Sequence, residues 1–221
     1  MAVLLLLGLS KQDRMDQLSS PLTRDSFSEG ITCLAKIDPD LGAIITRLGN
    51  PPLWAREPGF ATILLIILEQ QVSLASAKAT YDKLLNAAGL LTANRFLAFK
   101  DVELRQFGFS RQKANYGREL AKSILNGSLN PDELQNFDDS RVKNSLMAIK
   151  GIGPWTADIY LLMVLLRPDI WPSGDLALAK AVQKIKCLEK KPTPPALDEI
   201  AEQWRPWRAV AARILWLDYL N

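Results

Sequence analysis

Signals for the start and end of helices recur along the whole chain, and they constrain the fold more than any other feature. Polar cap residues are followed by apolar residues three and four positions apart, and Gly or Pro marks the ends of these segments. No Asn-Gly or similar turn lies between two alternating, strand-like runs. The sequence therefore predicts an all-α protein with about ten helices in short connections.

Individual helices follow from these signals. Apolar residues from Phe27 to Ile37 recur at helical spacing, and Asp38-Pro39 can cap and begin a second helix that ends near Gly49. Further helices are expected over 60–68, from Ser73 to Ala88, after Thr92, Asp101 and Ser110, from Pro131 and Asp138, over 154–167, from Leu176 to Lys186, and from Pro195 and Pro206.

Length and composition fit a soluble globular protein. The 221 residues suit one unit or two small lobes sharing a core, and 48% of them are apolar. The run Val3–Leu7 follows no Lys or Arg, and no stretch approaches the ~20 apolar residues of a membrane span. We expect no membrane association and a reducing compartment: the cytoplasm and nucleoid in a prokaryote, the nucleus or an organelle in a eukaryote.

The sequence contains no histidine, which excludes a Ser-His-Asp triad, a Cys-His dyad and any zinc site that needs imidazole. The two cysteines, Cys33 and Cys187, are too few for a four-cysteine iron–sulfur cluster or a zinc ribbon. Chemistry in this chain must therefore rest on carboxylates, lysine, hydroxyls, the backbone or a cofactor.

The charge is unevenly distributed, although the net charge is only +3. Five lysines fall within twelve residues that hold one acid, Glu189. A solvated helix face is the ordinary interpretation of such a run, and a polyanion partner is the alternative. The five are Lys180, Lys184, Lys186, Lys190 and Lys191.

The segment from Leu146 to Ala157 carries the most informative pattern. A helix is expected to end at Ile149, a turn with Gly151 and Gly153 follows, and a second helix begins at Pro154. Two such glycines allow a tight reversal and expose backbone N–H groups at a helix N-terminus, where the helix dipole favours an anion. The pattern indicates a phosphate-binding turn, with a glycine corner used only for helix packing as the alternative.

Asp175 follows Gly153 by twenty-two residues, with an apolar helix between them. If that helix turns back, Asp175 returns to the mouth of the hairpin. Alone, an Asp before Leu176 would be an ordinary helix cap. Together with the hairpin, it is interpreted as a catalytic carboxylate.

These segments together resemble the helix–hairpin–helix (HhH-GPD) base-excision DNA glycosylases, and more narrowly the branch typified by 3-methyladenine DNA glycosylase II. The resemblance runs from about Ile31 to Leu220 in the family's order. Besides the hairpin, it rests on Leu68 to Ser73, Gly108 to Ala114, Pro172 to Asp175 and Trp204 to Arg208.

The resemblance implies two helical lobes with a cleft between them. An N-terminal extension over 1–25 would precede a glycosylase domain over 26–221. Lobe one would combine 26–55 with about 175–221, and lobe two would span about 56–174. The large N-terminal β domain of longer bacterial relatives has no counterpart here, so we expect the compact form of the family.

The resemblance also implies the reaction. Asp175 would stabilise positive charge on the sugar as the glycosidic bond breaks, without the second acid that many relatives carry at the position of Gly174. Relatives that also cut the strand use a lysine where this chain has Trp155, so no lyase activity is expected. Trp155 and Trp207 would wall a pocket for a cationic alkylated purine, or pack in the core. Ile159 and Leu176 replace tyrosines of some relatives.

Contacts with DNA are expected from several segments. Gln71 lies in the turn from which relatives push a wedge into the space left by the flipped base. Hairpin carbonyls of Met147, Ile149 and Ile152 could hold Na⁺ or K⁺, and no other cofactor is expected. The remaining candidates for DNA contact are Gly151, Ile152, Gly153, Thr156, Ser110, Lys113 and Lys180.

The sequence thus predicts a monomeric, monofunctional glycosylase that acts on double-stranded DNA containing alkylated bases, chiefly 3-methyladenine. It would flip the damaged nucleotide out and hydrolyse its N-glycosidic bond in base excision repair. Two alternatives stay open. One is a DNA-binding protein without chemistry, and the other is a glycosylase for mismatched or deaminated bases.

Overall fold

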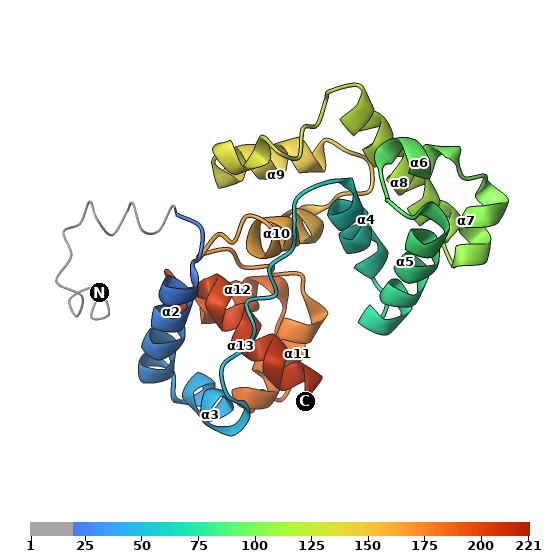
Figure 1. Cartoon of the computed structure of the whole chain (residues 1–221). Helices are drawn as coiled ribbons and strands as arrows, with labels where there is room; N and C mark the ends of the chain where they lie inside the picture. Colours follow the sequence, from blue (N-terminus) through green and yellow to red (C-terminus); the bar gives the residue numbers. More distant parts are fainter. Residues whose placement is uncertain (1–19) are drawn as a thin grey trace. The chain divides into compact units, whose positions relative to one another are not determined.

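The computed structural model describes residues 20–221, and every regular element among them is a helix (Figure 1). No strand occurs in this range, which confirms the predicted all-α class. No helix within it is both long enough and apolar enough to traverse a membrane. Residues 1–19, with the run Val3–Leu7 and most of the expected 1–25 extension, lie outside the described residues.

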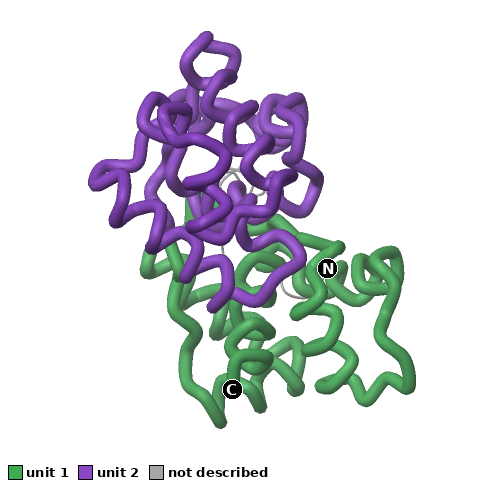
Figure 2. The backbone as a smooth tube through the Cα atoms, turned by 90° about the vertical axis from the view of Figure 1, so that its right-hand side faces the viewer, with its two compact units in different colours: residues 1–55, 165–221 green, residues 56–164 purple. Residues whose placement is uncertain are grey.

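The chain divides into two compact units (Figure 2). Unit 1 combines the described residues up to Ala55 with 165–221, and unit 2 comprises 56–164. Residues 165–174, expected in lobe two, pack within unit 1. The carbonyl of Leu166 accepts the N–H of Leu22 at 2.8 Å, and the ring of Trp171 lies 5.4 Å from that of Trp204.

Unit 1 is organised around its last helix, α13 (Arg208–Leu220). The other elements are α2 (Arg24–Ile37), α3 (Pro39–Leu48), α11 (Leu176–Ile185), α12 (Pro194–Ala201) and the 3-10 helix η3 (Glu202–Trp204). Helix α13 packs against α2, α3 and α11, so it is buried on nearly all sides. Even Arg213 is enclosed: its Nε donates to the Leu53 carbonyl at 2.7 Å, and burial lowers its pKa to about 9.

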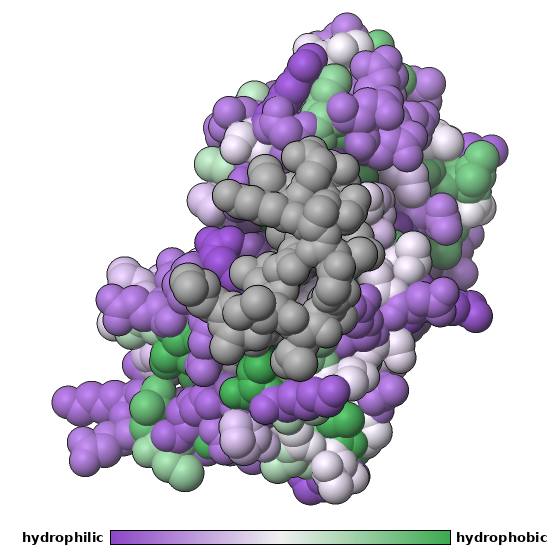
Figure 3. All heavy atoms as spheres, turned by 90° about the vertical axis from the view of Figure 1, so that its left-hand side faces the viewer, coloured by the Kyte–Doolittle hydropathy of each residue, from purple (hydrophilic) through white to green (hydrophobic). Residues whose placement is uncertain are grey.

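Unit 2 is organised around α4 (Phe60–Glu69), whose uniformly apolar sequence suits a central helix. The surrounding elements are α5 (Leu74–Ala88), α6 (Ala93–Ala98), α7 (Asp101–Phe107), α8 (Arg111–Leu125), the 3-10 helix η2 (Leu134–Asn136), α9 (Asp139–Met147) and α10 (Pro154–Met163). Helix α4 packs against α5, α8 and α10. Outside the grey atoms, hydrophilic side chains predominate on the molecular face in Figure 3, with hydrophobic ones in small patches.

Most predicted helix starts are confirmed, because the expected cap side chain accepts a backbone N–H of the first turn. This holds at Asp38, Ser73, Thr92, Ser110, Asp138 and Asp175.

Several predicted helix boundaries are wrong. The last helix begins at Arg208 rather than Pro206, and the first helix of the hairpin ends at Met147 rather than Ile149. Lys100, not Asp101, caps α7. Pro131 begins no α-helix, because the Asn130 side chain accepts the Asp132 N–H and holds a turn before η2. Helix α10 ends at Met163 rather than residue 167, since Leu166 has a left-handed φ of 53° and Pro168 disfavours helix before it.

Candidate functional site

Asp175 lies in unit 1 as the N-cap of α11, and hydrogen bonds orient its carboxylate. Oδ1 accepts the backbone N–H of Leu178 at 2.9 Å and the indole N–H of Trp216, on α13, at 3.3 Å. The residue is buried, with 8% of its surface exposed. A helix N-terminus and two N–H donors stabilise negative charge, so the structure fixes one carboxylate in a defined orientation.

The other predicted residues of unit 1 differ in exposure. Leu176 follows Asp175 and is 52% exposed, and Lys180 is exposed one turn later on α11. Trp207 is buried, and its ring lies where a Cβ on Gly30 of α2 would meet it at 3.0 Å. The indole of Trp207 therefore packs in the core of unit 1, and its role as a pocket wall stays a prediction.

The lysine run on and after α11 is partly engaged in ion pairs. Lys184 pairs with the buried Asp218 at 3.0 Å, and Lys186 pairs with Asp38 at 2.9 Å and with Asp40 at 2.8 Å. Burial raises the pKa of Asp38, but hydrogen bonds from Lys186 and from the Trp204 indole outweigh burial, and the net pKa is lowered. These two lysines stabilise unit 1.

The hairpin lies in unit 2, between α9 and α10. Gly151 has a φ of 98°, and a Cβ there would lie 2.1 Å from the ring of Tyr116 on α8. Both its backbone conformation and its packing therefore require glycine. Gly153, the N-cap of α10, has an ordinary φ of −102°, and no described atom lies within 4 Å of where its Cβ would be.

The backbone donors of the hairpin are not all alike. The N–H of Ile152 donates to the Ile149 carbonyl at 3.1 Å, so it closes the turn. Gly153 begins the first turn of α10, where N–H groups have no partner within the helix. The helix start, more than the turn itself, therefore offers donors for an anion.

The side chain of Gln70, the residue after α4, connects the turn that follows α4 to the hairpin. Its side-chain amide donates to the Gly151 carbonyl at 2.9 Å and to the Thr156 hydroxyl at 2.9 Å. Lys113 of α8 donates to the carbonyls of Leu68 at 2.7 Å and Gln70 at 2.8 Å. Burial lowers the pKa of Lys113. Lys113 thus binds the carbonyls at the C-terminal end of α4. Its contact with DNA stays a prediction.

The predicted side chains of unit 2 fall into exposed and buried groups. Gln71 is exposed, with a left-handed φ of 56°, and Ser110 is an exposed N-cap of α8. Thr156 is only 3% exposed, and its hydroxyl accepts a hydrogen bond from Gln70. Trp155 is half-buried one turn before Ile159, which is 2% exposed and belongs to the core.

The carbonyls predicted to hold a cation all lie at the hairpin. Met147 is the last residue of α9, and within 20–221 neither its carbonyl nor that of Ile152 accepts a backbone hydrogen bond across the turn. Ile149 accepts one hydrogen bond, which leaves its carbonyl a second lone pair. Oxygen donors of this kind fit a hard monovalent cation.

The sequence analysis did not predict the contacts of two residues at these sites. Trp216 reaches Asp175 across 41 positions, and Gln70 reaches Gly151 and Thr156 across 81 and 86 positions. Nothing in local spacing signals either contact, because Trp216 belongs to an apolar helix and Gln70 to an ordinary turn.

Known proteins match this chain in sequence and in fold. A DNA-3-methyladenine glycosylase of Bacillus subtilis is 25% identical over 68% of this chain. The chain spans 64% and 54% of the length of two Bacillus subtilis relatives. A Bacillus halodurans DNA-3-methyladenine glycosidase structure has 28% identity and a TM-score of 0.68, covering 87% of this chain and 88% of that one.

The 3-methyladenine DNA glycosylase of Schizosaccharomyces pombe, solved with abasic DNA, shares the fold. Its TM-score is 0.81 at 24% identity, covering 85% of this chain and 95% of that one. The family described as "HhH-GPD superfamily base excision DNA repair protein" matches residues 64–206, well over half of the chain. The chain belongs to the HhH-GPD superfamily of base excision DNA repair proteins.

Proposed function

We propose that this protein is a monofunctional DNA glycosylase that hydrolyses the N-glycosidic bond of alkylated bases, chiefly 3-methyladenine, in double-stranded DNA. The observation that carries the proposal is the buried Asp175 carboxylate, oriented by the Leu178 N–H and the Trp216 indole in a member of this repair superfamily. The names of the relatives support the choice of an alkylated base.

Asp175 acts through its charge. As the bond to the base lengthens, the sugar becomes cationic, and a carboxylate about 4 Å away gains about 4 kcal/mol at an effective dielectric of 20. That energy corresponds to roughly a thousandfold in rate. An N-alkylated base already carries positive charge and leaves without a proton donor, which suits a chain without histidine.

The absence of lyase activity follows from Trp155. Strand cleavage by relatives needs an amine that attacks C1′ and forms a Schiff base, and an indole cannot supply one. The product would be an intact abasic site. In the hairpin, the first turn of α10 would hold a DNA phosphate, and the carbonyls of Met147, Ile149 and Ile152 would hold a monovalent cation that neutralises phosphate charge.

The test is release of bases from methylated duplex DNA, with heat or alkali revealing the abasic sites. Asp175→Asn should reduce release about a thousandfold, because it removes the charge. Asn is as good an N-cap as Asp, so α11 should stay intact, and circular dichroism and urea unfolding check this. No release by wild type, or equal release by a folded Asp175→Asn variant, would favour the DNA-binding protein without chemistry.

The substrate is tested separately with matched duplexes that contain one 3-methyladenine, 7-methylguanine, hypoxanthine or uracil. Single-turnover rates should be highest for the two cationic bases, because they need no protonation to leave. A clear preference for uracil would replace the alkylated base with a deaminated one while keeping Asp175 in its role.

A further inference from the structure

An ion pair in unit 2 joins Arg56 to Glu69, the last residue of α4. The contact is bidentate: Nη1 of Arg56 donates to Oε2 of Glu69 at 3.0 Å, and Nη2 donates to Oε1 at 2.8 Å. The Glu69 side chain is only 9% exposed, so solvent screens this pair less than a pair on the surface. Two parallel hydrogen bonds also fix the orientation of both side chains.

Local sequence preference does not explain an acid at position 69. The C-terminal end of a helix carries partial negative charge, so a carboxylate there is unfavourable. Burial of a charge adds a further cost unless the charge is paired. A neutral side chain would end α4 without either cost, which indicates that the pair of Glu69 with Arg56 serves the segment that follows the helix.

Arg56 is itself fixed by its backbone. It is the first residue of unit 2, and its N–H donates at 2.9 Å to the carbonyl of Met163, the last residue of α10. The ion pair therefore connects the start of unit 2 and the end of α10 to the last turn of α4. That turn leads directly into Gln70 and Gln71.

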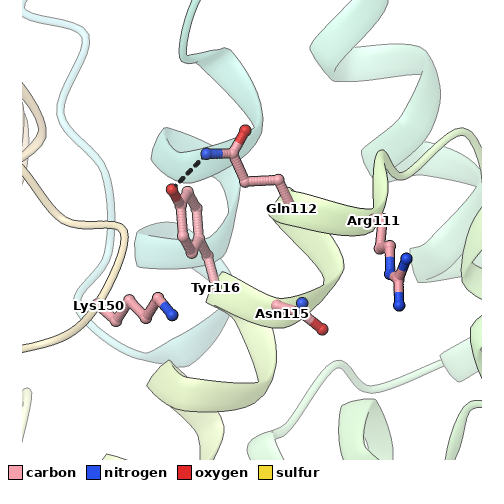
Figure 4. Close-up of a pocket in the computed structure, with 5 residues that line it drawn as sticks. All are labelled: Arg111, Gln112, Asn115, Tyr116 and Lys150. Carbon is pink, nitrogen blue, oxygen red and sulfur yellow. Dashed lines mark hydrogen bonds between the residues drawn. The ribbon is translucent and has the colours of Figure 1, made fainter.

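Other contacts fix the same turn from the hairpin and from α8. The Gln70 side chain donates to the Gly151 carbonyl, and Lys113 donates to the Gln70 carbonyl. Gly151 packs on the ring of Tyr116, whose hydroxyl accepts a hydrogen bond from Gln112 at 2.6 Å (Figure 4). The backbone that precedes the predicted wedge is thus held by several independent contacts.

The side chain of Gln71, in contrast, is unconstrained. Gln71 is exposed, and its side chain forms no hydrogen bond with any residue of 20–221. Its φ of 56° is unfavourable for a residue with a Cβ, and such a conformation persists only where the surroundings fix the backbone. The turn therefore presents one free side chain on a backbone whose shape is set by the folded protein.

We propose that Arg56 and Glu69 are positioning residues for the wedge: they fix the last turn of α4 so that Gln71 enters the space left by a flipped nucleotide without reordering of the turn. The inference rests on the proposed function, which requires base flipping, and on the predicted wedge role of Gln71. A turn that is ordered before binding loses less conformational entropy on DNA, so more of the wedge's contact energy appears as affinity. The pair acts through Gln71 and needs no contact of its own with DNA.

The experiment is a double-mutant cycle between Glu69→Gln and Gln71→Ala. Fluorescence anisotropy measures affinity for two duplexes of the same sequence, one undamaged and one with a tetrahydrofuran abasic-site analogue, which carries no base. Glu69→Gln keeps the size of the side chain and removes its charge. It should weaken binding to the abasic duplex about fivefold and leave binding to undamaged DNA unchanged. In the Gln71→Ala background, Glu69→Gln should change neither affinity.

Arg56→Lys tests the geometry of the pair and replaces Glu69→Gln in the cycle if that variant is unfolded. Lysine keeps the positive charge but cannot form two parallel hydrogen bonds with one carboxylate. The loss of affinity for the abasic duplex should therefore be smaller, about twofold, and should again require Gln71. Urea unfolding shows which variants are folded.

Asp101→Asn is the matched control. It removes a carboxylate of unit 2 that pairs at 2.6 Å with Arg118, whose side chain is exposed to nearly the same extent as that of Arg56. This pair joins α7 to α8 and does not involve the turn after α4. Asp101→Asn should leave the preference for the abasic duplex unchanged.

Several results would overturn the inference. An equal loss of affinity with and without Gln71, an equal loss on both duplexes, or a loss as large in Asp101→Asn would show that Glu69 only stabilises the fold. Equal binding of the two duplexes by wild type would also overturn it, because there would be no wedge to position.

Failure of this inference is distinguishable from failure of the proposed function. The abasic analogue has no base to release, whereas the proposed function is tested by base release and by Asp175→Asn. Coupling between Glu69 and Gln71 in a chain that releases no base would support the positioning role and contradict the proposed activity. Base release without this coupling would do the reverse.

Discussion

The surroundings of Asp175 in unit 1 and the hairpin in unit 2 are built in opposite ways. In unit 1 a side chain carries the chemistry, and a backbone N–H from Leu178 together with the Trp216 indole orients it. In unit 2 the backbone is the binding element, and side chains of Gln70 and Tyr116 fix its shape. Charge is therefore the essential property of the first region, and shape that of the second.

This difference separates the expected effects of substitution. Replacing Asp175 by Asn removes charge but preserves the cap, so rate should fall while stability stays. A substitution at Gly151 alters a backbone conformation that the Tyr116 ring packs against, so its main expected effect is a loss of stability rather than of rate. Substitutions in each region test whether charge and shape are separated in this way.

Gly151→Ala should have the largest effect on stability. An L-residue at a φ of 98° costs about 1–2 kcal/mol, and its Cβ would lie 2.1 Å from the Tyr116 ring, which adds about 1–3 kcal/mol of overpacking. We expect the free energy of unfolding in urea to fall by about 3 kcal/mol. Gly153→Ala is the matched control, since its φ is ordinary and its Cβ position is open. Equal stability of the two variants would remove the argument that shape governs the hairpin.

Asp38→Asn should destabilise unit 1 by about 2 kcal/mol near neutral pH, because the buried Asp38 carboxylate accepts from Lys186 and Trp204. Its pKa is lowered below the ordinary value of 3.8. The stabilisation is therefore present above that value and is lost as pH falls through the folded-state pKa.

Urea unfolding of both proteins from pH 6 to pH 3 checks this prediction. The difference between wild type and Asp38→Asn should shrink as the solution becomes more acidic. A difference that is constant over this range would show that the Asp38 charge does not contribute.

Local signals in the sequence were sufficient for most helices. Ser73, Ser110 and Asp175 each cap the helix predicted for them, because a cap depends only on residues within one turn. The helix predicted from Pro131 was wrong because a local signal can favour two structures. Proline suits a first helical turn, but the neighbouring Asn130 stabilises a turn instead.

The candidate sites were less predictable, because their contacts join distant segments. Asp175 and the two hairpin glycines could be selected from motif spacing, whereas Gln70 and Trp216 could not, since their partners lie 41 to 86 positions away. Lys113 has the sequence context of a DNA contact, yet it lies within reach of carbonyls at the end of α4. A cation near unpaired helix carbonyls binds them.

Gln70→Met should lower the free energy of unfolding by about 1–2 kcal/mol. Methionine has a similar size but cannot donate, so the carbonyl of Gly151 and the hydroxyl of Thr156 lose their donor. Hydrogen exchange of the hairpin amides should accelerate more than that of α5. Gln71→Met, one residue later and exposed, is the control. Unchanged hairpin exchange in Gln70→Met would mean that the turn holds its shape without this contact.

Trp216→Phe should have the smallest effect, and it tests whether orientation matters in addition to charge. Phenylalanine keeps an aromatic ring in the core but removes the N–H that donates to Asp175 at 3.3 Å. A bond of that length to a carboxylate contributes about 1 kcal/mol, so the single-turnover rate of base release should fall about fivefold. Trp171→Phe makes the same chemical change in unit 1 at a buried indole whose Nε1 has no hydrogen-bond partner within 20–221. Both variants should lose comparable stability, and only Trp216→Phe should lose rate. If their rates are equal, the carboxylate acts through its charge alone, and the indole is a packing residue of α13.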